Sequence, residues 1–168
     1  MDKNFENTNE QEDKSLQQEE LKDKGLKISE TWMYKIFVKS AYRLLQKPLT
    51  ILQILKKAVA RLQQYQNVKE FTEDVKDHVS TLIRITRAYA KNEYRDISKR
   101  NMALSIAAII YFISPLDIIP DFLAAGLIDD IAILLWVYKN MQTEIDAFLE
   151  WEDAQKIRIE IGTIEDNK

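Results

Sequence analysis

The stretch that decides the fold is Ser114-Pro115-Leu116-Asp117-Ile118-Ile119-Pro120-Asp121, followed by Gly126 and the pair Asp129-Asp130. Two prolines, one glycine and four carboxylates lie here among nearly continuous Ile, Leu, Phe and Ala. A carboxylate in so apolar a setting has to be hydrogen-bonded, paired or hydrated, because an unpaired buried charge is very costly. Pro115 prevents the simple continuation of a preceding helix. We therefore expect a shaped turn that folds two apolar helices back on each other over residues 98–151.

The chain between its polar ends is predicted to be helical. Apolar residues recur at spacings of three and four, which predicts helices near 29–45, 48–65, 67–91, 98–115 and 129–151. Pro48 suits the first turn of the second helix, and Asn67 with Glu70 forms a capping pair at the start of the third. We expect an all-α fold, with about five helices in a compact bundle around a central apolar helical hairpin.

Composition limits the possible classes of protein. The 168 residues fit one domain with tails. The chain has no cysteine, which excludes disulfides and thiolate metal sites and favours a cytoplasmic setting. Its one histidine, His78, excludes a zinc site built from several histidines.

The two ends of the chain are polar. Residues 1–28 have no apolar run, which predicts a disordered acidic tail and no signal peptide. Residues 29–152 are expected to form the helical domain, with 98–151 as its core. Residues 153–168 are expected to form a polar C-terminal tail, in which 157–161 alternate as a short strand would.

The net charge of −3 hides an uneven distribution. Residues 1–30 carry five basic and nine acidic groups, residues 31–101 carry 15 and six, and residues 102–168 carry four and 12. A basic middle between acidic ends indicates either an anionic partner or pairing within the molecule. The basic residues are spread over three predicted helices and interleaved with acidic ones, so we do not expect nucleic-acid binding.

The segment 111–122, followed by Gly126-Leu127-Ile128-Asp129-Asp130, resembles the YkvA-like family of bacterial proteins. The family signature is an apolar helix, then Ser-Pro-apolar-Asp-apolar-apolar-Pro-Asp, then Gly-apolar-apolar-Asp-Asp and a second apolar helix. A weaker resemblance extends the match to about residues 68–152. Asn92, Ser98 and the run Leu123-Ala124-Ala125 depart from the usual pattern. The resemblance implies a domain of unknown function, often with predicted membrane association, and no activity to transfer.

The aspartates have three interpretations. The favoured one is structural: they cap helix ends and pair with Arg84, Arg87 or Arg95. The residues expected to hold and shape the turn are Ser114, Pro115, Asp117, Pro120, Asp121, Gly126, Asp129 and Asp130. The alternatives are a Mg²⁺ or Ca²⁺ site formed by Asp117, Asp121, Asp129 and Asp130, and a catalytic carboxylate pair. The sequence offers no nucleophile, phosphate loop or cofactor motif nearby, so we expect no enzyme, no cofactor and no resident metal.

Membrane contact is the remaining question. Asn101–Leu116 is uncharged over 16 residues, or about 24 Å of helix, which is short of the roughly 20 residues that a span needs. A shallow hairpin or a surface helix would suit this sequence better. In the first helix Trp32, Met33, Tyr34 and Phe37 supply an apolar face. The side chains expected to face lipid are Trp32, Lys35, Lys39 and Arg43.

The function predicted from the sequence is a non-enzymatic, membrane-associated structural or interaction module on the cytoplasmic side. Its expected partners are a membrane surface or a hydrophobic partner helix. The alternative is a soluble cytoplasmic bundle that binds a protein partner or a divalent cation through the aspartates.

Overall fold

The computed structural model describes the backbone of residues 3–114 and 123–166, and the side-chain surroundings of residues 11, 13–114 and 127–156. Its helices are α1 (Lys3–Ser29), α2 (Trp32–Leu44), α3 (Pro48–Gln64), α4 (Glu73–Ala90), α5 (Lys99–Ile113), α6 (Leu123–Asn140) and α7 (Gln142–Asp166). The described part of the chain is all-α, as the sequence predicts. It has seven helices, so the expectation of about five is wrong.

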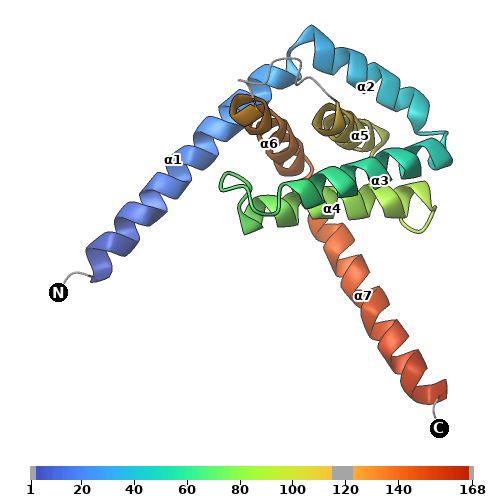
Figure 1. Ribbon diagram of the computed structural model, residues 1–168. Coiled ribbons are helices and arrows are strands. Elements are labelled where there is room, and N and C mark those ends of the chain that lie inside the picture. The colour runs from blue at the N-terminus through green and yellow to red at the C-terminus, as the bar shows by residue number, and fades with distance from the viewer. Residues whose placement is uncertain (1–2, 115–122, 167–168) are drawn as a thin grey trace.

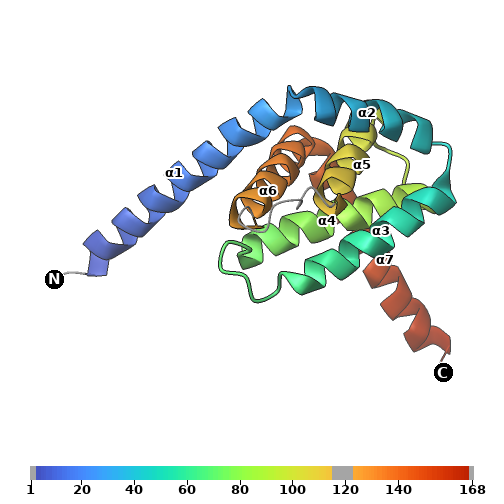
Figure 2. The ribbon, with the colours of Figure 1, turned by 45° about the horizontal axis from the view of Figure 1, so that its top comes forward.

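The helices are arranged around α5 and α6, which pack against each other (Figure 1). On one side α1 packs across α6 and α2 packs on α5; on the other side α3 packs on α5, and α4 packs on both α5 and α6 (Figure 2). Every residue from 102 to 109 is buried, which explains why α5 is apolar all round. The two central helices are therefore enclosed by the rest of the bundle.

Side-chain caps fix where several helices begin. Thr31 Oγ1 accepts a hydrogen bond from the backbone N–H of Tyr34 at the start of α2, and Ser98 Oγ accepts one from Asn101 at the start of α5. Pro48 occupies the first turn of α3, as predicted. The helix expected from Asn67 begins later, because Thr72 is the residue in extended conformation and its Oγ1 accepts the N–H of Val75.

The predicted last helix is two helices. α6 ends at Asn140 and α7 begins at Gln142, with Met141 buried at the corner. Neither glycine nor proline marks this break in the sequence. The first part of α7 packs through Ile145 and Phe148, whose side chains are buried.

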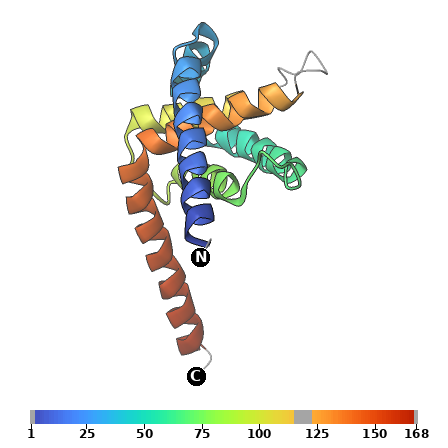
Figure 3. The ribbon, with the colours of Figure 1, turned by 90° about the vertical axis from the view of Figure 1, so that its left-hand side faces the viewer.

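Both terminal segments are helical where the sequence predicted tails. α1 begins at Lys3, and α7 continues to Asp166 through the segment that alternates as a strand. α1 buries Gly25 and Ile28, and this docking onto α6 was not visible in so polar a sequence. Residues 11 and 13–20 are exposed. Both long helices extend beyond the packed body (Figure 1), and Figure 3 shows this most clearly for α7. Within the described residues, none of the helices has the length and apolar character needed to span a bilayer.

Candidate functional site

Asp129 and Asp130 lie within α6 rather than at its start. Because α6 begins at Leu123, the two carboxylates are more than a turn inside the helix, and the prediction that they cap it is wrong. Gly126 also lies within α6, so it does not form the turn expected of it. Successive residues of a helix point about 100° apart, so the two aspartates face different neighbours.

Asp129 faces α1 and Asp130 faces α3. Asp129 Oδ1 lies 2.8 Å from Lys24 Nζ, and these side chains are 38% and 43% exposed. Asp130 Oδ2 lies 3.5 Å from Arg61 Nη2, and here the side chains are only 10% and 18% exposed. The pair of aspartates therefore connects α6 to two other helices, once at the surface and once in the interior.

Arg61 lies between the carboxylate and two aromatic rings. Its guanidinium carbon is 5.5 Å from the centre of the Tyr65 ring and 5.6 Å from that of Phe112, within the range of a cation–π contact. Arg61 thus joins α3 to both α5 and α6. Within the described residues, the half-buried guanidinium contacts the Asp130 carboxylate and both ring faces.

Tyr111, the residue before Phe112 in α5, is affected by the charges of both aspartates. Burial raises its pKa to about 12, and the carboxylates of Asp129 and Asp130 add to the rise. The neutral phenol is therefore favoured in the folded chain.

This pKa predicts a loss of stability in alkali. A group whose pKa is higher in the folded state stabilises that state below its unfolded pKa of about 10, and the contribution fades as the pH rises towards 12. Tyr111→Phe should reduce the fall in melting temperature between pH 10 and pH 12, measured by circular dichroism. An equally steep fall in the variant would contradict this assignment.

The arginines expected to pair with the aspartates lie elsewhere. Arg84 Nε donates to Glu152 Oε1 on α7 at 2.9 Å. Arg95 Nε donates to Asn92 Oδ1 at 2.8 Å, and its guanidinium lies 4.0 Å from the centre of the Tyr89 ring. Arg87 is exposed on α4. For Asp129 and Asp130 the predicted partners are therefore wrong, since Lys24 and Arg61 take this role.

The predicted turn is only partly described. Ser114 ends α5 as expected, with its N–H and its hydroxyl both donating to the carbonyl of Ile110, at 3.0 and 2.7 Å. Pro115, Asp117, Pro120 and Asp121 lie outside the described residues. Within the described part, no three carboxylate or imidazole groups come together in a way that could hold a metal ion. The four-aspartate cation site therefore stays a prediction.

A second candidate site is the outer face of α2. Trp32, Ile36 and Tyr42 are exposed, with 71% of Trp32 accessible, and Lys35, Lys39 and Arg43 are exposed beside them. These positions follow helical spacing, so they form one face. Leu49, at the start of α3, is 75% exposed and adds to the apolar side chains beyond the end of α2. We call Trp32, Lys35, Ile36, Lys39, Tyr42 and Arg43 the outer face.

The apolar side of this face differs from the prediction. Tyr34 is buried, and its hydroxyl donates to the carbonyl of Leu104 at 3.1 Å. Phe37 packs edge-on against Tyr111, with ring centres 6.2 Å apart. Met33 is half-buried. Ile36 and Tyr42, rather than these residues, join Trp32 as the exposed apolar side chains of α2. They follow Trp32 by four and ten residues, a helical spacing in the sequence that could have identified them.

Comparison with known proteins gives one family and one relative. The family described as "Protein of unknown function (DUF1232)" matches residues 101–136, which cover most of α5 and the first part of α6. A protein of Bacillus subtilis (strain 168) named "Uncharacterized membrane protein YkvA" is 33% identical over 75 residues, which is 44% of this chain and 71% of the relative. No solved structure matches the chain.

Proposed function

The chain belongs to the YkvA-like family, and on this basis we propose that it is a non-enzymatic helical module that attaches to an anionic membrane surface through the outer face of α2. The proposal places this attachment on the cytoplasmic side. The observation that carries it is the outer face itself, where exposed apolar side chains alternate with exposed cations.

The composition of the outer face suits the boundary between water and lipid. A tryptophan places its large apolar ring at the level of the headgroups, while Lys and Arg side chains extend towards anionic groups and keep their stems on the apolar layer. Lys35, Lys39 and Arg43 make no ion pair within the described part of the chain, so their charges are available to an outside anion.

The rest of the fold supports attachment at the surface. Residues 102–109 of α5 are enclosed by neighbouring helices, so lipid contact there would require the bundle to open. The outer face needs no rearrangement to meet a bilayer. The name of the Bacillus subtilis relative, which calls it a membrane protein, agrees with this proposal.

Vesicle co-sedimentation tests the proposed function. The full chain should pellet with vesicles that contain phosphatidylglycerol and stay in the supernatant with vesicles of phosphatidylcholine alone. Bound protein should be released as the salt concentration rises, because the Debye length shortens to about 3 Å at 1 M. Equal pelleting with both kinds of vesicle would contradict the electrostatic part of the proposal, and no pelleting with either would contradict attachment.

A further inference from the structure

α1 approaches α6 unusually closely at Gly25. A Cβ atom added there would lie 2.4 Å from the carbonyl oxygen of Ala132 and 2.5 Å from the Cβ of Trp136. Any other residue would therefore force the two helices apart. Leu21 and Ile28, about one turn to either side of Gly25, pack on the core, and Lys24 pairs with Asp129.

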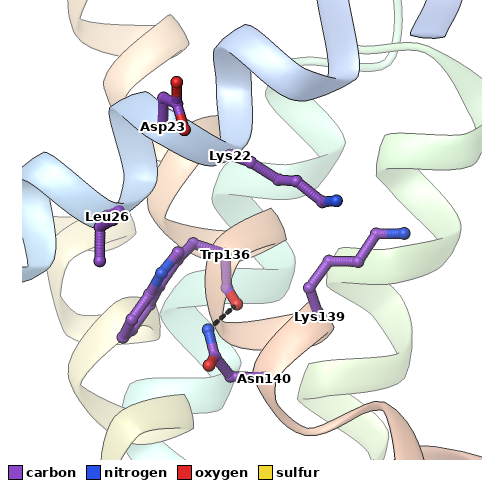
Figure 4. Close-up of a pocket in the computed structure, with 6 residues that line it drawn as sticks. All are labelled: Lys22, Asp23, Leu26, Trp136, Lys139 and Asn140. Carbon is purple, nitrogen blue, oxygen red and sulfur yellow. Dashed lines mark hydrogen bonds between the residues drawn. The ribbon is translucent and has the colours of Figure 1, made fainter.

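The residues of α6 beneath α1 form one stripe, which consists of Asp129, Ala132, Trp136 and Lys139. Farther along the same contact, Lys22, Asp23 and Leu26 of α1 and Trp136, Lys139 and Asn140 of α6 surround a hollow of about 260 Å³ (Figure 4). The side chains of Lys22 and Lys139 extend from the two helices on the same side of this hollow (Figure 4). This hollow is a shallow depression, open to solvent, at the edge of the contact.

The contact between α1 and α6 is short compared with the length of α1. Residues 11 and 13–20 are exposed, and that part of the helix extends away from the body (Figure 1). α1 is held by the side chains of Leu21 and Ile28, by the close contact at Gly25 and by the half-exposed Lys24–Asp129 ion pair. In α5, by contrast, eight consecutive residues (102–109) are buried. Although the backbones of α1 and α6 are close, α1 buries few side chains. Elements that bury little open at lower free energy than the core does, so we expect α1 to separate before the other helices unfold.

Any segment that replaces α1 on this stripe of α6 has to match two of its features. The occupant must bring a residue without a side chain opposite Ala132 and a cation opposite Asp129. A bilayer offers no matching backbone surface opposite Ala132, and contact with its acyl region would remove the Asp129 carboxylate from water at a cost. A helix with the spacing Leu-x-x-Lys-Gly-x-x-Ile meets both requirements, and residues 21–28 have this sequence.

We propose that α1 is an exchangeable helix, which binds the α6 stripe of a second copy of this chain with the same contacts that it makes on its own. In the exchanged dimer Lys24 of each copy pairs with Asp129 of the partner copy. The connection between α1 and α2 is only Glu30 and Thr31, so straightening it carries α1 away from its own α6. Exchange of an identical element is a low-cost route to a dimer.

Thr31 holds the bend that keeps α1 on its own chain. Its hydroxyl donates to the carbonyl of Ile28 at 2.7 Å and accepts the N–H of Tyr34 at 3.3 Å. Thr31→Ala removes both bonds and favours one continuous helix through α1 and α2, so it should increase the exchanged fraction.

Cross-linking between two differently tagged copies tests the exchange. Because the chain has no cysteine, only the introduced thiols can react with the cross-linker. One copy carries Lys22→Cys and the other Lys139→Cys, which leaves the Lys24–Asp129 pair intact. After the copies are mixed and incubated, a short bismaleimide should link the two introduced thiols, one from each copy. The yield of this mixed product should rise with protein concentration and in Thr31→Ala. Both residues line the same hollow, which is why a short linker is chosen.

Two controls separate exchange from random collision. Gln17→Cys, on the exposed part of α1, replaces Lys22→Cys and should give only background product. Gly25→Leu, added to the Lys22→Cys copy, should abolish the specific product, while circular dichroism and melting show that the other helices are intact. A mixed product no greater than that of Gln17→Cys at every concentration would overturn the proposal, as would a product that survives Gly25→Leu. In a variant with Trp32→Phe and Trp151→Phe, Trp136 is the one tryptophan left. If brominated lipid quenches it without any mixed product, lipid rather than a second copy covers the stripe, and the proposal is equally overturned.

Discussion

Asp130→Ala is expected to lower the free energy of unfolding by about 3 kcal/mol. Removing one partner of a buried ion pair typically costs about 3–5 kcal/mol, because the other charge is left in a poorly solvated place. The low end of this range applies here, because the Asp130 and Arg61 side chains keep 10% and 18% of their exposure. Urea denaturation followed by circular dichroism measures the change.

The neighbouring aspartate supplies a matched control. Asp129 makes the same kind of pair with Lys24, but both side chains are about two-fifths exposed, and exposed pairs typically contribute about 0.2–1 kcal/mol. Asp129→Ala should therefore cost under about 1 kcal/mol. Replacing Asp130 and Arg61 together with Leu should recover part of the loss, since a buried pair can be exchanged for apolar packing. Equal effects of the two single alanine variants would contradict the distinction between a buried and a surface contact.

Neutralising Lys35, Lys39 and Arg43 together to Gln should weaken binding to anionic vesicles by about 100-fold. Each basic residue near an anionic surface contributes roughly 1 kcal/mol, and about 1.4 kcal/mol corresponds to a factor of ten. The folding of the variant should change little, because all three side chains are exposed. Binding is measured by titrating vesicles into a fixed amount of protein.

The control variant removes the same charge elsewhere. Arg87, Lys99 and Arg100 are exposed on α4 and at the start of α5, and changing them to Gln leaves the outer face intact. This variant should bind nearly as the original chain does. If both triple variants lost affinity equally, net charge would account for binding and the outer face of α2 would have no special role.

Much of the fold could be predicted from the sequence because its core helices are strongly patterned. The uncharged run that forms α5, with Ser98 before it and Ser114 after it, has few alternatives to a buried helix. α1 could not be predicted in the same way. Gly25 is an unfavourable residue for a helix interior, and it is useful only because Ala132 and Trp136 lie against it, which the sequence alone does not show.

The sequence indicated which residue types form the candidate sites, but it did not indicate which side chains they contact. Carboxylates among apolar residues were expected to be hydrogen-bonded, paired or hydrated. Asp130 pairs with Arg61 rather than with the predicted Arg84, Arg87 or Arg95. The choice of partner depends on which helices surround α6. On α2, the cations predicted to face lipid are exposed, and their contact with lipid stays a prediction. Tyr34 and Phe37 face inward because α2 packs on α5 through them.

The central claim is that Trp32 enters the headgroup layer of an anionic bilayer. The most direct measurement uses a variant with Trp136→Phe and Trp151→Phe, in which Trp32 is the one tryptophan left. Its fluorescence is recorded with vesicles whose phosphatidylglycerol-containing bilayers carry bromine at shallow or deep positions along the acyl chain. We predict a blue shift and stronger quenching by the shallow bromines. Protein that pellets with the vesicles while Trp32 remains unshifted and unquenched would contradict the account.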